Sequence, residues 1–296
     1  MNFNLTGSGV ALITPFDSQG NVEHRALQAM VDFMVDGGID FIVALGTTAE
    51  TPALSKNDRE AVLDTIRGRL NGRIPLVLGM GGNDTHELLE HIKSFDLTGV
   101  DALLSVTPYY NRPSQEGLYR HYAQVANATD LPIILYNVPF RTGCNLTAET
   151  TLRLAHDFPN IVGTKEASGD FGQIADVLCH RPAGFKVYSG DDLLSIPLIS
   201  LGADGVISVV ANAFPNAFSE MVKNARAGNY KQALAGHEKL LPIIKHIFQE
   251  GSPSGVKAIL AQRGMIEPHL RLPLVEISEK LKSALKELDE AWLGPK

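Results

Sequence analysis

Residues 132–167 read "PIILYNVPFRTGCNLTAETTLRLAHDFPNIVGTKEA", in which two short apolar runs flank a helical pattern. The runs at 132–139 and 160–167 are rich in β-branched residues and predict strands. Thr147 precedes "AETTLRLAH", whose spacing of apolar residues is helical, and a threonine at that point is a favourable N-cap. A strand, a helix and a second strand in this order predict a βαβ unit with parallel strands.

The same alternation runs through most of the chain. Further helix starts are Ser55 before "KNDREAVLDTIRGRL", Asp84 or Thr85 before "HELLEHIKSF", and Ser114 before "QEGLYRHYAQVA". Eight βα units are the number that closes a (β/α)8 barrel, whereas open doubly wound sheets usually stop near five or six strands. The predicted strands cover 9–16, 39–46, 74–81, 101–108, 132–139, 160–167, 185–191 and 205–212.

We therefore predict an α/β protein, a TIM barrel over residues 1–228 with a C-terminal helical region over 229–296. The last predicted helix spaces its apolar residues three or four apart, which suits packing on the barrel or on a partner subunit. These residues are Ile277, Leu281, Leu285, Leu288 and Trp292.

Composition narrows the classes of function. The 296 residues are 44% hydrophobic and 20% charged, with a net charge of −7 and no basic stripe, which argues against nucleic acid and acidic membrane surfaces as partners. Membrane association is also not expected, because no stretch approaches the roughly 20 apolar residues of a span. The N-terminus lacks the basic region of a secretory signal, so a cytoplasmic location is expected.

Cysteine and histidine spacing gives little support to a metal site. Cys144 and Cys179 are the only cysteines, without C-x-x-C spacing, and the nine histidines form no H-E-x-x-H motif. "GMGGND" after the third strand lacks both the G-x-G-x-x-G register and a Walker lysine. We expect a tight turn there and no metal.

Polar side chains gather where the predicted strands end, the face on which TIM barrels place their active sites. The second strand ends in "GTTAET", the fourth in "TPYYNRP", the fifth in "YNVPFRTG", the sixth in Lys165 and the seventh in "SGDD". Because these ends meet at one mouth of the barrel, we expect the polar residues to converge there.

Lys165 ends an apolar strand, and strand alternation gives it the same parity as Gly163 and Ile161. If that face points inward, burial favours the free amine, the form that attacks a carbonyl to make an imine. Tyr136 and other hydroxyl groups from neighbouring strands could move the protons that this chemistry requires. The alternative is a lysine at a strand end that pairs with Glu166 or reaches solvent.

Taken together, these motifs resemble the dihydrodipicolinate synthase branch of the pyruvate-dependent class I aldolase superfamily, which also contains N-acetylneuraminate lyase. The similarity covers nearly the whole chain, with "GTTAET", "TPYYNRPSQEGLY", "YNVPFRTG", "GTKEASGD", "SGDD" and "GVISV" in the same order. The resemblance places the Schiff-base lysine on Lys165, with Tyr136, Thr47 and Tyr110 as the proton relay. It implies that Tyr110 reaches into the neighbouring subunit's site.

The resemblance also implies the substrates and how they are held. Pyruvate would form an imine with the lysine, and the enamine would attack aspartate 4-semialdehyde, with no cofactor. The substrate-binding residues would be Thr48, Arg141, Gly190 and Ile207, of which Arg141 would receive the carboxylate of the aldehyde substrate. A homotetramer built from two tight dimers is expected.

A second site is implied at the dimer interface, where lysine-sensitive relatives bind L-lysine. Lys56 and Arg59 stand where sensitive relatives have histidine, so we expect weak or absent inhibition by L-lysine. The matching positions are Thr51, Lys56, Arg59, Asn83, Glu87 and Tyr109.

One residue departs from the family pattern, which is commonly G-T-T-G-E: this chain has Ala49 at the fourth position, where the pattern has glycine. If the position required positive φ, alanine would displace the backbone around Thr48 slightly.

Two other functions remain open from the residues. One is another enzyme of the same superfamily, an aldolase or dehydratase that uses pyruvate or a 2-keto-sugar acid, and Arg141 discriminates in favour of the synthase. The other is a catalytically silent barrel, which would be expected to have lost Lys165 or Tyr136.

Overall fold

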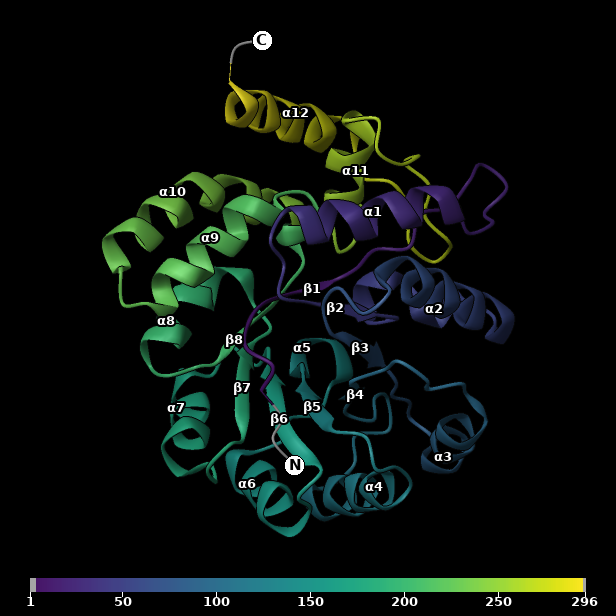
Figure 1. Ribbon diagram of the computed structural model, residues 1–296, viewed down its shortest axis with the longest axis vertical. Helices are drawn as coiled ribbons and strands as arrows, with labels where there is room; N and C mark the ends of the chain where they lie inside the picture. The colour runs from purple at the N-terminus through teal and green to yellow at the C-terminus, as the bar shows by residue number, and fades with distance from the viewer. Residues whose placement is uncertain (1–3, 295–296) are drawn as a thin grey trace.

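The computed structural model describes residues 4–294 and contains a closed barrel of eight parallel strands. Each strand pairs with the next one in sequence, and β8 pairs with β1 to close the barrel. Helices surround the barrel (Figure 1). The predicted TIM barrel is confirmed. Its strands are β1 Gly7–Ala11, β2 Phe41–Ala44, β3 Leu76–Gly79, β4 Ala102–Val106, β5 Ile133–Asn137, β6 Ile161–Glu166, β7 Lys186–Ser189 and β8 Gly205–Ser208.

Helices follow the strands, and their starts agree with the capping signals in the sequence. The side chains of Ser55, Ser114 and Thr147 accept backbone hydrogen bonds at the first turns of α2, α4 and α6. Asp84, the first of the two candidates, caps α3. The helices around the barrel are α1 His24–Asp36, α2 Lys56–Leu70, α3 Thr85–Ser94, α4 Gln115–Asn127, the short α5 Pro139–Thr142, α6 Ala148–Asp157, α7 Phe171–His180, α8 Ser195–Ser200 and α9 Pro215–Arg226.

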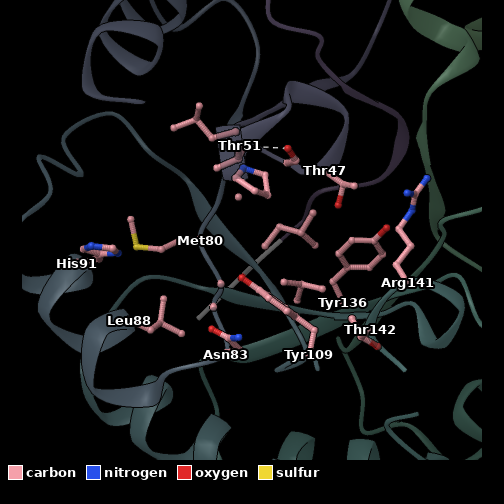
Figure 2. A pocket seen from close by; sticks show the side chains of 18 of the residues that line it. Thr47, Thr51, Met80, Asn83, Leu88, His91, Tyr109, Tyr136, Arg141 and Thr142 are labelled. Carbon is pink, nitrogen blue, oxygen red and sulfur yellow. Dashed lines mark hydrogen bonds between the residues drawn. The ribbon is translucent and has the colours of Figure 1, made fainter. Parts of the chain in front are cut away.

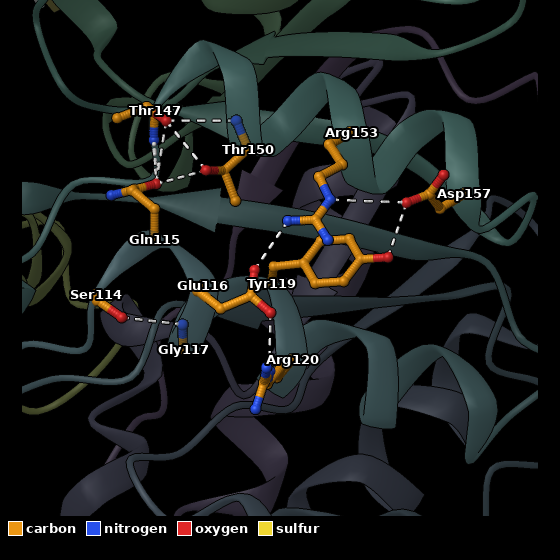
Figure 3. A network of polar contacts seen from close by, with 10 residues as sticks. All are labelled: Ser114, Gln115, Glu116, Gly117, Tyr119, Arg120, Thr147, Thr150, Arg153 and Asp157. Carbon is orange, nitrogen blue, oxygen red and sulfur yellow. Dashed lines mark hydrogen bonds and ion pairs between the residues drawn. The ribbon is translucent and has the colours of Figure 1, made fainter.

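Helices α4 and α6 are joined by polar contacts along their length (Figure 3). The Gln115 side chain accepts a hydrogen bond from the Thr150 hydroxyl at 2.7 Å and donates one to the Asn145 carbonyl at 2.7 Å. At the other end, the Tyr119 hydroxyl donates to Asp157 at 2.7 Å. Because Asn145 follows α5, these contacts fix the segment behind Arg141.

The predicted strands all run past the observed strand ends, and the excess is largest at β1 and β8. β1 ends at Ala11 and β8 at Ser208, although the apolar runs continue to 16 and 212. Asn212 lies in a 3-10 turn and bonds the backbone of both Ala11 and Ile13, at 2.8 and 3.1 Å. A side chain therefore satisfies backbone groups that strand pairing would otherwise have satisfied.

The C-terminal region consists of α10 Tyr230–Ile247, α11 Ser254–Gln262 and α12 Glu279–Leu293. In Figure 1 these helices lie outside the barrel on one side, with α10 against α9 and α12 farthest from the strands. Helix α12 buries Leu281 and Leu285, and the Trp292 ring meets Phe214 edge-on at 5.2 Å. It thus packs on its own chain. In residues 4–294 no helix is both long and apolar enough to cross a membrane.

Candidate active site

Lys165 points into the barrel. It lies beside Tyr136 of β5 and Tyr188 of β7 in the strand register. Register partners share a face, and both tyrosines belong to the apolar cluster inside the barrel. Lys165 is only 5% exposed, and its Nζ lies 4.4 Å from the centre of the Tyr136 ring. The amine is therefore held in an apolar space next to a phenol.

The parity predicted for Ile161 was wrong. Ile133 pairs with Ile161, but Ile134 pairs with Gly163, so Val162 is an extra residue at a bulge. Ile161 packs in the layer between strands and helices, while Val162 packs inside the barrel. Gly163 and Lys165 both come after the bulge, so they still share one face of the strand, as predicted.

Glu166 does not pair with Lys165 in the part of the chain that the structure describes. Its buried carboxylate accepts hydrogen bonds from the Asn137 amide, 3.3 Å from each oxygen, and from the Ser168 hydroxyl at 2.9 Å. Burial raises the pKa of Glu166 to about 7. Asn137 directly follows Tyr136, and Glu166 directly follows Lys165. The contact between Asn137 and Glu166 therefore joins β5 to β6 next to the tyrosine and the lysine.

Gly190 gives Lys165 its space. A Cβ at this position would lie 3.0 Å from Lys165 Cε and 2.8 Å from Ala167 Cβ, both closer than ordinary contacts. The Gly190 amide also donates to the Glu166 carbonyl at 2.6 Å, which holds the loop after β7 against β6. Ile207 of β8 lies in the same interior cluster as Tyr136. The structure thus brings Gly190 and Ile207 to the same side of the barrel as the lysine.

A cavity of about 390 Å³ opens at the carboxyl ends of the strands (Figure 2). Thr47, Tyr136 and Arg141 line it, coming from the β2 turn, β5 and α5 respectively. Thr48 is buried beside Thr47 and does not line the wall. Lys165 likewise does not line the wall, but its Nζ lies 4.4 Å from the centre of the Tyr136 ring, which does. The cavity therefore combines hydroxyl groups and a fixed cation next to a buried amine.

The effect expected from Ala49 does not occur. Thr47–Ala49 forms a 3-10 turn, and positive φ falls on Leu45 at 54° and Glu50 at 57° instead. Alanine is therefore unstrained at position 49, and it does not displace the backbone of Thr48.

Tyr110 is not part of this cavity. Its side chain is 85% exposed, and its φ of 77° is unusual for a residue other than glycine. The neighbouring Tyr109 lines the cavity instead. A single chain thus brings Thr47 and Tyr136 to one cavity, with Lys165 beside Tyr136, but leaves Tyr110 exposed outside it.

The residues expected at a second site mostly share the same cavity. Those that line it are Thr51, Arg59, Asn83, Glu87 and Tyr109.

Lys56 is the exception in that set, because its amine lies outside the cavity, 3.9 Å from Glu60. His91 also lines the wall and was missed by the sequence analysis. Its spacing of four residues from Glu87 on α3 was the available signal, and the two side chains lie 3.9 Å apart.

The fold and the site define a TIM barrel with a lysine buried inside the strands and a cavity at their carboxyl ends. The model of the dihydrodipicolinate synthetase family matches residues 4–291, and the chain belongs to that family.

Similar proteins agree with this assignment. The 4-hydroxy-tetrahydrodipicolinate synthase of Phocaeicola vulgatus is 52% identical, with 96% of this chain and 97% of the relative covered. That of Parabacteroides distasonis is 50% identical, with 97% and 98% covered. The crystal structure of the chloride-inhibited dihydrodipicolinate synthase of Acinetobacter baumannii, complexed with pyruvate, is 42% identical with a TM-score of 0.93, covering 96% and 97% of the two chains.

Proposed function

We propose that this enzyme condenses pyruvate with aspartate 4-semialdehyde to 4-hydroxy-tetrahydrodipicolinate, in lysine and diaminopimelate biosynthesis, with Lys165 as the Schiff-base lysine. The observation that carries this assignment is the Lys165 amine, 5% exposed and 4.4 Å from the Tyr136 ring, at the end of a barrel strand. An amine held in this space is placed to act as the nucleophile that attacks a carbonyl and forms an imine.

In the proposed mechanism the Lys165 amine adds to the C2 carbonyl of pyruvate and the carbinolamine loses water to give an imine. Loss of a proton from C3 gives an enamine, whose C3 attacks the aldehyde carbon of the second substrate. The amine of that substrate then displaces the lysine and closes the ring. Tyr136 and Thr47 would carry the protons within the subunit, and Tyr110 would complete the relay from the partner.

The two substrate carboxylates would be bound on different sides of the cavity. The backbone at Thr48, together with Gly190 and Ile207, would hold pyruvate close to the lysine. Arg141 lines the cavity and would bind the carboxylate of aspartate 4-semialdehyde. A guanidinium can hold a carboxylate through two parallel hydrogen bonds, which fixes orientation as well as charge.

Exposed aromatic residues after the fourth and fifth strands support a proposed assembly of several copies. Tyr110 is 85% exposed and Phe140 is 96% exposed, which suits an interface with a second copy. A tight dimer would bring Tyr110 into the partner's site, and we propose that two dimers form a tetramer in the cytoplasm. Residues 1–228 would form the catalytic barrel, and 229–296 would support it.

The test is a ¹H NMR assay of both substrates with the wild type and two variants. We expect one-to-one consumption of pyruvate and aspartate 4-semialdehyde, abolished in Lys165→Ala and retained in Lys245→Ala, which removes an exposed lysine. Consumption of pyruvate only with an uncharged polyhydroxylated aldehyde would instead indicate the related aldolase activity. Absence of turnover with any aldehyde would indicate a silent barrel.

A further inference from the structure

The turn after β2 contains a backbone conformation that needs support. Glu50 has φ 57° and ψ 33°, in the left-handed region, where residues other than glycine are uncommon. It separates two 3-10 turns, Thr47–Ala49 and Thr51–Ala53. Thr47 and Thr48 therefore depend on how Glu50 is held.

The C-terminal region binds both oxygens of the Glu50 carboxylate. Lys257 of α11 donates to Oε1 at 2.7 Å, and the backbone amide of Arg271 donates to Oε2 at 2.9 Å. Lys257 and Glu50 have side-chain exposures of 0% and 1%. Lys257 also donates to the Thr14 carbonyl at 2.9 Å, and its amine lies 4.4 Å from the centre of the Phe16 ring.

Further contacts extend this hold along the turn. The Thr14 hydroxyl donates to the Ala49 carbonyl at 2.9 Å. The Arg271 guanidinium donates to the Ala53 carbonyl at 2.9 Å and to Asp58 at 2.7 Å. The segment is thus fixed at four points, three of them by residues more than 200 positions away in sequence.

Stability alone is a weak reason for a buried ion pair. Removing two charges from water costs about as much as their attraction returns, and well-packed apolar residues often replace such pairs without loss. Fixing one conformation is a better-supported use, and here the fixed element carries Thr47 and Thr48. The geometry therefore indicates that the ion pair controls the position of the β2 turn.

We propose that Glu50, Lys257 and Arg271 are positioning residues, through which the C-terminal region fixes the β2 turn for binding of the pyruvate carboxylate. This inference rests on the proposed function. It gives the helical region after the barrel a specific part in the reaction.

The test uses the full-length enzyme with both charges removed, Glu50→Gln with Lys257→Met, because a single substitution leaves one buried charge and can prevent folding. The matched control is Arg263→Met with Asp289→Asn, which removes another ion pair of the C-terminal region that does not contact the β2 turn. We expect the Glu50/Lys257 variant to keep its unfolding midpoint. Its KM for pyruvate should rise on the order of ten- to hundredfold, with a smaller change in kcat. The control should keep the wild-type KM.

A second readout does not depend on the reaction. Hydrogen–deuterium exchange of residues 46–53 should become faster in the Glu50/Lys257 variant, while β5 and β6 stay protected. A wild-type KM together with unchanged exchange would overturn the proposal, and so would activity that falls only in proportion to the folded fraction. If wild-type enzyme formed no borohydride-trapped pyruvate adduct, the proposed function would fail, and the exchange at 46–53 would still decide whether the pair positions the turn.

Discussion

Replacing Glu166 with glutamine should change how the stability of the protein depends on pH. The carboxyl is 1% exposed, and burial raises its pKa from the ordinary 4.5 to about 7. Because the folded pKa lies above the unfolded one, the folded state binds the proton more tightly. The stability linked to this proton is fully present below pH 4.5 and is lost as the pH rises through 7.

The size of the effect follows from the pKa difference. A change from 4.5 to about 7, at 1.36 kcal/mol for each pKa unit, corresponds to about 3 kcal/mol in total. Most of it, about 2–3 kcal/mol, falls between pH 5 and 8. Glutamine has no proton to lose in this range and keeps an oxygen that can accept from Asn137.

The assay is urea unfolding of the wild type and Glu166→Gln at pH 5, 6, 7 and 8, at one protein concentration. The free energy of unfolding of the variant should rise relative to the wild type by about 2–3 kcal/mol from pH 5 to pH 8. Asp192, whose pKa burial raises to about 6, affects both proteins equally and cancels in the difference. A constant difference across the four pH values would refute the reasoning.

Further predictions concern substrate binding, the space beside Lys165, assembly and inhibition. Arg141→Ala should lower kcat/KM for aspartate 4-semialdehyde by about ten- to a hundredfold, because it removes a contact worth about 1.5–3 kcal/mol. Borohydride trapping of pyruvate should stay the same. An equal loss in both measurements would mean that Arg141 has a structural role. Gly190→Ala should slow trapping sharply without changing the circular dichroism spectrum, because the added Cβ would lie 3.0 Å from Lys165 Cε; unchanged trapping would contradict that packing. Sedimentation should detect no fully active monomer, since Tyr110 would act in the partner's site. L-lysine should inhibit weakly, because Arg59 in the cavity wall adds positive charge near a ligand with two ammonium groups. Two like charges about 6 Å apart repel by roughly 3 kcal/mol before screening. Half-maximal inhibition well below millimolar, measured at fixed pyruvate, would disprove this.

Much of the fold could be predicted because its signals are local. Ser55, Ser114 and Thr147 cap helices through hydrogen bonds to residues three positions away, and the alternation of strands and helices defines the barrel. The inward orientation of Lys165 also follows from local alternation after the bulge. Ile161 was misplaced because a single extra residue changes strand parity and leaves no clear mark in the sequence.

The long-range parts of the site could not be predicted. Lys257 and Glu50 are 207 residues apart, and neither carries a local signal of its partner. The strained φ at Glu50 rather than at position 49 depends on the same distant contacts. The 85% exposure of Tyr110 likewise leaves no mark in the local sequence pattern.

Lys165 is the residue that we propose forms the imine with pyruvate. Borohydride added to the enzyme with pyruvate should attach one reduced pyruvate unit per chain, measured by intact mass. Peptide mapping should place it on Lys165, and Lys165→Ala should remain unlabelled. Labelling that persists in Lys165→Ala, or that maps to another lysine such as Lys257, would contradict the account.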